Sequence, residues 1–143
     1  MAKNSGQITN DILSALRGIR KESGFRSAPV CVTETPITFE QAGVFPALSV
    51  QMLRERVTYF PARRSRRAMR VLITGLVRPG AGADKLQAAR DLMTDVEEAL
   101  MADPTRGGAA ILTQVIETRF DATAHEDGAR ASSVVEIVAH EEV

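Results

Sequence analysis

The chain has 143 residues, of which 44% are hydrophobic, 25% charged and 4% aromatic, and its 18 basic and 18 acidic side chains give a formal net charge of zero. This length is typical of one domain with a mainly aliphatic core, which we expect to span residues 1–143. Zero net charge excludes long-range attraction to nucleic acid or to an anionic membrane, so any such binding would be local. The single cysteine, Cys31, excludes an internal disulfide and a zinc site with several cysteine ligands.

The beginning of the chain lacks the apolar segment of a signal peptide, and nowhere do about eighteen apolar residues follow one another. We therefore expect neither export nor membrane spanning, and interpret the chain as a soluble cytoplasmic product of a reducing compartment.

Apolar residues recur at helical spacing in residues 6–22, and Ser23-Gly24 supplies a stop, so this segment predicts an amphipathic helix. A β-rich run at 29–33 predicts a short strand, followed by a loop through Pro36 and Gly43. The runs "PALSVQMLRERVTYF" and "RAMRVLITGLV" then alternate apolar and polar side chains, which predicts two antiparallel strands of a long hairpin.

Asp84 and Gln87 match a capping box in front of an apolar stripe, which predicts a second helix at about 84–102. The run "AAILTQVIETRF" carries apolar residues on both faces, so we expect a largely buried strand. A polar span, 121–130, leads to a last strand at 131–143. The order of elements predicts an α+β fold: a mixed, mostly antiparallel sheet of about five strands, two helices packed on one face, and a protruding long hairpin.

Charge is unevenly distributed along the chain. Eight arginines lie between Arg54 and Arg78 against a single acid, Glu55, whereas the chain from Asp84 onward is strongly acidic. Apolar alternation fades after Met52 and resumes at residue 69, so we expect the arginine-bearing end of the hairpin to extend beyond the core as an arm.

Three interpretations of this arm remain open. The first is a solvated tip with no partner. The second is a nucleic-acid site, although only two aromatic residues, Tyr59 and Phe60, lie nearby and the net charge is zero. The third is a subunit contact in which the basic pole of one copy meets the acidic pole of the next. The charge asymmetry favours the subunit contact. Its candidate residues are Arg63, Arg64, Arg66, Arg67 and Arg70.

No motif indicates catalysis, a cofactor or a metal. His125 and His140 lie far apart without ligand spacing and are interpreted as surface residues, while Cys31 is interpreted as a buried thiol. The run "GLVRPGAGAD" lacks the Lys-Ser/Thr of a P-loop and is interpreted as a strand-to-helix connection. The carboxylates of Asp95 and Glu98 are placed on the polar face of the second helix.

The chain resembles the tail-terminator, or tail-completion, proteins of long-tailed bacteriophages, the group of minor tail protein U. The likeness rests on "ILSALRGI", "FPALSVQ", the arginine-flanked hairpin, "LMTDVEEALMADP", "TRGGAA" and "SSVVEIVAHEEV", in this order. The residues that match the family's turn after the second helix are Asp103, Pro104, Thr105, Gly107 and Gly108. Arg106 departs from the pattern, because an apolar residue is expected there.

The resemblance implies a non-enzymatic virion protein without cofactors. Six copies would form a ring that caps the head-proximal end of the tail tube, stops its polymerisation and offers a surface for joining the head. The implied partners are further copies of the chain, the tail-tube protein, a head-side connector and, in a contractile tail, the sheath protein. The five candidate arginines would line the surface between subunits or the surface that faces the tube, some of them toward the lumen. DNA would only pass through the lumen, and assembly would take place in the host cytoplasm. The alternatives are another head–tail connector or neck component, and a small DNA-binding protein that uses the arginine hairpin.

Overall fold

The computed structural model describes residues 5–61, 63–80, 82–106, 108 and 110–142, with the backbone alone described at 5 and 140–142. Its helices are α1 (Ser5–Arg17), the short 3-10 helix η1 (Lys21–Ser23), α2 (Phe39–Ala42) and α3 (Lys85–Met101). Its strands are β1 (Cys31–Thr33), β2 (Ala47–Phe60), β3 (Arg64–Val77), β4 (Leu112–Asp121) and β5 (Ala129–Glu142).

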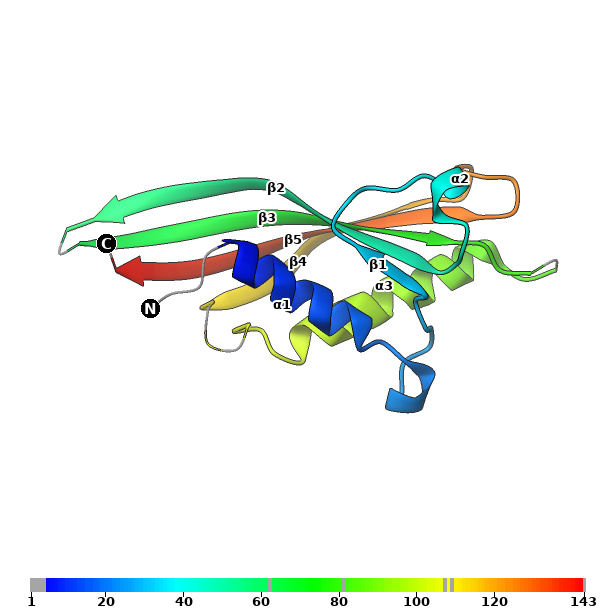
Figure 1. Cartoon of the computed structure of the whole chain (residues 1–143), viewed down its shortest axis with the longest axis horizontal. Coiled ribbons are helices and arrows are strands. Elements are labelled where there is room, and N and C mark those ends of the chain that lie inside the picture. Colours follow the sequence, from blue (N-terminus) through cyan, green and yellow to red (C-terminus); the bar gives the residue numbers. More distant parts are fainter. Residues whose placement is uncertain (1–4, 62, 81, 107, 109, 143) are drawn as a thin grey trace.

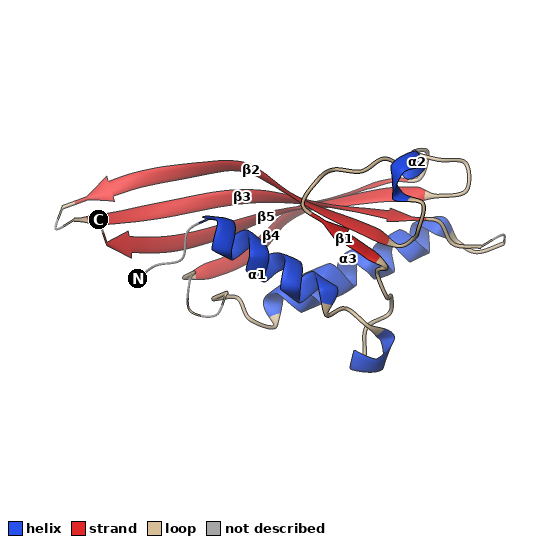
Figure 2. Ribbon diagram, in the orientation of Figure 1, coloured by secondary structure: helices blue, strands red, loops and turns tan. Residues whose placement is uncertain are grey.

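The five strands form one sheet in the order β1-β2-β3-β5-β4. β1 is parallel to β2, and every other neighbouring pair is antiparallel. The two long helices, α1 and α3, lie against the same face of the sheet (Figures 1 and 2). This arrangement confirms the predicted α+β fold, its mixed sheet and its two-helix layer.

The main core lies between the sheet and these two helices. On β3 the buried residues Met69, Val71 and Ile73 alternate with less buried ones, so odd-numbered positions face the helices. Gly75 continues this row, and α3 passes so close that a Cβ there would lie 2.7 Å from side-chain atoms of Leu92 and Met93. No long helix of the described residues covers the opposite face of the sheet, and we call it the open face.

Helix α1 ends at Arg17, so the prediction of a helix as far as residue 22 is wrong for its last five residues. Gly18 follows at once and disfavours a helical backbone, and its N–H is shared between the carbonyls of Ser14 and Ala15. Ile19, which continued the apolar spacing, is nevertheless buried. Its apolar character therefore reflects a core position beyond the helix end.

The segment predicted as a loop through Gly43 contains the short helix α2. Thr38 and Gln41 form its capping box, since the Thr38 side chain accepts from the Gln41 N–H and the Gln41 side chain accepts from the Thr38 N–H. Phe39 of this helix packs with Ala47 and Leu76 in a second, smaller core.

The predicted long hairpin is formed by β2 and β3, and it extends beyond the two helices as an arm (Figure 1). A third strand runs along it, because β5 pairs with β3 as far as the pair of Arg64 and Glu142. The arm is therefore a three-stranded extension of the sheet, which gives its backbone more hydrogen-bond partners than an isolated hairpin has.

Strand β4 was predicted to be largely buried, and this prediction is wrong. It occupies an edge of the sheet, so that only β5 pairs with it among the described strands. Of its side chains only Thr113 is buried, whereas Leu112, Ile116 and Phe120 are 40%, 45% and 43% exposed. The apolar pattern on both faces was real, but the edge position leaves these residues on the surface.

Candidate assembly interface

The alternation of β3 divides the candidate arginines between the two faces of the arm. Arg64, Arg66 and Arg70 occupy even positions and lie on the open face, whereas Arg67 lies on the side of the helices. Arg63 belongs to the turn at the tip and has a left-handed backbone with φ of 57°. The structure thus brings three of the five sequence-predicted arginines together on one face.

Two further arginines join this face from β2. Arg54 pairs with Arg70 across the hairpin and Arg56 pairs with Ala68, and directly paired residues of neighbouring strands share a face. We call the resulting set the arginine face, made of Arg54, Arg56, Arg64, Arg66 and Arg70. The sequence-based selection omitted Arg54 and Arg56, although pairing the two alternating runs across the tip would have placed them there.

Most of the arginine face keeps an uncompensated charge. Arg70 forms an ion pair with Glu136 of β5, with 3.4 Å between Nε and Oε2. On the other side of the arm, Arg67 pairs with Glu55. Among the described side chains, no ion pair involves Arg54, Arg56, Arg64 or Arg66, all of which are exposed. A row of solvent-exposed, like-charged guanidinium groups is suited to an acidic partner surface.

The acidic residues are separated from the arm only in part. The loop between β4 and β5, which carries Glu126 and Asp127, lies at the end of the molecule opposite the arm tip (Figure 1). Glu136, by contrast, is carried by β5 alongside the arginine face. The expected two-pole distribution therefore applies to the ends of the long axis but not along the arm.

Asp121 begins that acidic loop and is held in its charged form. Its Oδ1 accepts hydrogen bonds from the side chain and the backbone N–H of Thr123, at 2.7 and 2.9 Å. The bond from the Thr123 side chain, followed by the bond from its backbone N–H, lowers the pKa of Asp121 below its ordinary value. The loop therefore presents a carboxylate at neutral pH.

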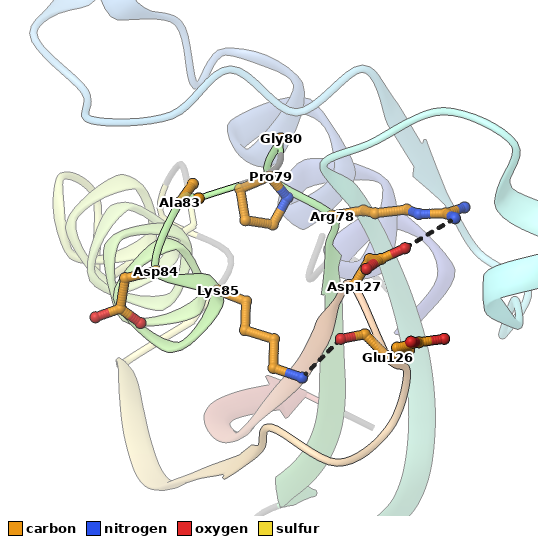
Figure 3. Close-up of a pocket in the computed structure, with 9 residues that line it drawn as sticks. Arg78, Pro79, Gly80, Ala83, Asp84, Lys85, Glu126 and Asp127 are labelled. Atoms are coloured by element: carbon orange, nitrogen blue, oxygen red, sulfur yellow. Dashed lines mark hydrogen bonds and ion pairs between the residues drawn. The ribbon is translucent and has the colours of Figure 1, made fainter.

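A pocket of about 630 Å³ lies between the β3–α3 connection and the loop before β5 (Figure 3). Its charged groups hold these two loops together. Lys85 Nζ donates to the backbone carbonyls of His125 and Glu126 at 3.1 and 3.2 Å, and Arg78 pairs with Asp127 at 3.7 Å. In the expected strand-to-helix connection, Asp84 accepts the N–H groups of Leu86 and Gln87 at the start of α3, so these two donors are already occupied.

The remaining polar candidates have structural contacts. His125 is half-buried, its ring stacks on Phe39 at 5.0 Å between centroids, and its Nδ1 accepts from the Asp127 N–H. The side chain of His140 lies outside the described residues. Cys31 is half-buried rather than fully buried. Within the described part of the chain, no group of three or more potential metal-binding side chains exists, and no helix is long and apolar enough to span a membrane.

Asp95 was placed on the polar face of α3, and this placement is wrong. Its side chain is completely buried and accepts the backbone N–H groups of Arg26 and Ser27, at 3.1 and 2.7 Å, together with the Ser27 hydroxyl. Glu98, one turn later, is exposed as expected and pairs with Arg26. The hydrogen bond to Glu98, and then the one to Asp95, raises the pKa of Arg26. Asp95 thus anchors the loop between η1 and β1 to α3.

The turn after α3 is organised by the side chain of Asp103 at its start and by a left-handed glycine near its end. Asp103 Oδ1 accepts the Thr105 N–H and hydroxyl at 3.2 and 2.8 Å, Pro104 lies between them, and Gly108 has a left-handed φ of 86°. Gly107 lies outside the described residues. Arg106, where an apolar residue was expected, is indeed buried at 1% exposure, with a φ of 49°. A buried site at this position therefore holds a charged side chain.

Comparison with known proteins finds no protein family and no curated protein that matches this sequence. Among solved structures, the fold is similar to a chain of the virion of a native gene transfer agent particle, with a TM-score of 0.50 and 12% identity over 96% of this chain and 97% of that one. It is also similar to a chain of the sheath/tube terminator of PVC, an extracellular contractile injection system, in its extended state. That match has a TM-score of 0.54 and 12% identity, and covers 99% of this chain but 59% of that one. At this level of identity, the two matches establish a shared fold.

Proposed function

We propose that this chain is a non-enzymatic structural protein of a phage or phage-like tail. It forms a ring at the head-proximal end of the tail tube, ends tube polymerisation there and provides the surface to which the head is joined. The observation that carries the proposal is the likeness of fold, over 99% of the chain, to a chain of a sheath/tube terminator. The match to a virion chain of similar length supports a role as a particle component.

The charge arrangement supports assembly from identical copies. The arginine face lies on the arm at one end of the long axis, and the acidic loop with Asp121, Glu126 and Asp127 lies at the other. Two different and complementary patches on one subunit favour a head-to-tail contact, and such contacts close into a ring when the rotation between neighbours permits it. A ring of six copies is what the resemblance to tail terminators implies.

Within this proposal, the partners are the tail-tube protein below the ring, a head-side connector above it and, if the tail is contractile, the sheath protein. The position is the tail of the virion. The arginine face contacts an acidic surface of one of these neighbours, and the arm's exposed guanidinium groups supply the charge for that contact.

The test is electron microscopy with mass determination on the purified protein, alone and mixed with polymerising tail-tube protein of the same particle. We expect rings of six, or tubes that stop growing when the protein is added. A monomer that neither forms rings nor alters the tubes would contradict the proposal.

A charge-reversed variant tests the role of the arginine face. Arg64→Glu with Arg66→Glu changes two exposed side chains that form no ion pair among the described residues, so the fold should be preserved while ring formation or capping is lost. Arg67 is unsuitable because reversing it also breaks its ion pair with Glu55. Arg90→Glu on the exposed side of α3 is the matched control. Normal capping of tubes by the double variant would show that the arginine face is not required for assembly.

A DNA-binding function is the second candidate, because Phe60 is 45% exposed and pairs with Arg64 within the arginine face, offering a ring beside several guanidinium groups. Phosphate contacts by these arginines predict that log affinity falls with log salt at a slope of about −0.9 per contact. Steep salt-dependent binding of duplex DNA by the isolated chain, without effect on tubes, would favour this function over the terminator.

A further inference from the structure

Both edges of the sheet keep long unpaired stretches. β1 covers the outer edge of β2 only at Ala47–Ser49, so the edge from Gln51 to Phe60 has no partner among the described strands. The outer edge of β4, from Leu112 to Asp121, likewise has none among them. An unpaired strand edge exposes backbone N–H and C=O groups that another strand can satisfy.

The directions of the two edges match. Because the pairs β2·β3, β3·β5 and β5·β4 are all antiparallel, β2 and β4 run in opposite directions within the sheet. A second copy that continues the sheet, with its helices on the same side, therefore brings its β4 antiparallel to β2 of the first copy. Antiparallel pairing is the more stable of the two arrangements.

The position of β1 fixes the register of such a pair. The strand pairs connect Asp121, through β5 and β3, with Ala47, so these two residues lie at the same height along the sheet. A neighbour placed beside the first copy at the same height would put its last three β4 residues where β1 already pairs with β2. The neighbour must therefore move toward the arm tip. A shift by an even number of residues keeps side chains of the open face beside side chains of the open face. Four residues is the smallest even shift at which the neighbour's β4 no longer overlaps the three residues of β1. A stagger between neighbours is also what a sheet requires in order to close on itself.

This shift aligns the ends of the two strands and most of their side chains. Leu112 of one copy comes level with Phe60 of the other, where both strands end. On the open face, Glu117 then lies beside Arg56. On the helix side, Val115 lies beside Val57. Leu112 and Val115 of β4 thus meet apolar side chains on the arm, and the carboxylate of Glu117, which already accepts from Arg119, meets the guanidinium of Arg56.

One contact in this register is unfavourable, because Arg119 comes level with Arg54. Arg119 Nε is already bonded to Glu117 Oε1 at 3.0 Å, which partly neutralises it. Pairing two β2 edges would be worse, since Arg54 and Arg56 of both copies would then face each other. The charges therefore disfavour a contact between two β2 edges.

We propose that neighbouring copies of this chain join by strand addition, β4 of one copy pairing antiparallel with the free edge of β2 of the next in this register. The inference rests on the proposed ring and names a contact between the long edges of neighbouring subunits that closes it, in place of a contact between the ends of their long axes.

Disulfide trapping tests the register. Thr58 and Gln114 lie opposite each other in adjacent copies. Within one chain they lie three strands apart and four residues out of register, more than about 14 Å, which is too far for an internal disulfide. In a Cys31→Ser background, Thr58→Cys with Gln114→Cys should give a reducible ladder of covalent oligomers on oxidation. Thr58→Cys with Asp121→Cys, which is out of register, should give none. No ladder from the first pair, equal ladders from both, or strong dimers of Thr58→Cys alone would overturn the proposal.

A charge swap tests the same contact without cysteines. Arg56→Glu and Glu117→Arg should each weaken self-association by about tenfold, measured by sedimentation, and the double variant should restore it, whereas Arg90→Glu should have no effect. Two singles that assemble normally, or a double that is not restored, would overturn the strand pairing. Rings or capped tubes without the disulfide ladder would support the proposed function and contradict this contact. A ladder without rings or capping would support the contact and contradict the proposed function.

Discussion

The guanidinium of Arg106 joins the end of α3 to the middle of α1, with 3.2 Å between its Nη1 and Oδ2 of Asp11. Its Nη2 donates to the backbone carbonyls of Leu100 and Asp103, which lie at the C-terminal end of α3. The last carbonyls of a helix have no partner within the helix and carry its negative dipole end, so a cation there satisfies both needs. Arg106 is thus buried because it caps one helix and pairs with another.

Replacing Arg106 with Met should lower the free energy of unfolding by about 2–4 kcal/mol, because the carbonyls of Leu100 and Asp103 lose the guanidinium and keep only backbone donors, while Asp11 loses its ion pair. Urea denaturation followed by circular dichroism measures this loss. Asp11→Asn is the matched control: Asp11 is partly exposed and the carbonyl bonds remain, so we expect a loss of about 1 kcal/mol or less. Equal stabilities of Arg106→Met and the unaltered chain would show that the site prefers an apolar side chain.

Asp95→Asn should destabilise the chain by about 2–3 kcal/mol. The amide cannot accept from Arg26 N–H, Ser27 N–H and the Ser27 hydroxyl as two carboxylate oxygens do, and its NH₂ group would face donors. Thermal unfolding, together with faster hydrogen exchange at Ser27, would report the released loop. Glu98→Gln, whose carboxylate is exposed, should stay within about 0.5 kcal/mol of the parent.

The sequence predicted the structure correctly where the spacing of apolar residues alone determines the type of element and its buried face. The apolar stripe of α3, the alternation of the hairpin and the charge run correctly predicted the helix layer and the arm. It failed for β4, because an apolar pattern on both faces of a strand does not distinguish an edge strand from a central one. It failed for Asp95 as well, since a buried carboxylate that accepts loop N–H groups looks, in sequence, like any acid on a helix. By contrast, the alternation of side chains along a strand alone predicts that Arg66 and Arg67 lie on opposite faces.

Gly75→Ala should cost about 1–3 kcal/mol of stability through overpacking, since the new Cβ would lie 2.7 Å from Leu92 Cδ2 and from Met93 Cε. These atoms end flexible side chains, so the helix should shift and the chain should still fold. Denaturant titration measures the loss. Gly80→Ala is the control, because a Cβ there meets nothing within 4 Å and should change stability by less than about 0.5 kcal/mol. A Gly75→Ala variant as stable as the control would show that α3 has room to adjust.

Thr123→Val should raise the pKa of Asp121 toward its ordinary value, because the hydroxyl that donates to Oδ1 is the largest cause of the lowered pKa. The backbone N–H of residue 123 still donates, so part of the lowering should remain. A carboxylate whose pKa is lower in the folded state contributes stability above its unfolded pKa and loses it as pH falls through its folded pKa. The variant should therefore lose less stability on acidification than the parent. NMR titration of the Asp121 carboxyl carbon measures the shift directly, with Thr118→Val, whose hydroxyl contacts Ser133 instead, as control. An unchanged Asp121 pKa in Thr123→Val would mean that the backbone N–H alone maintains the charged form.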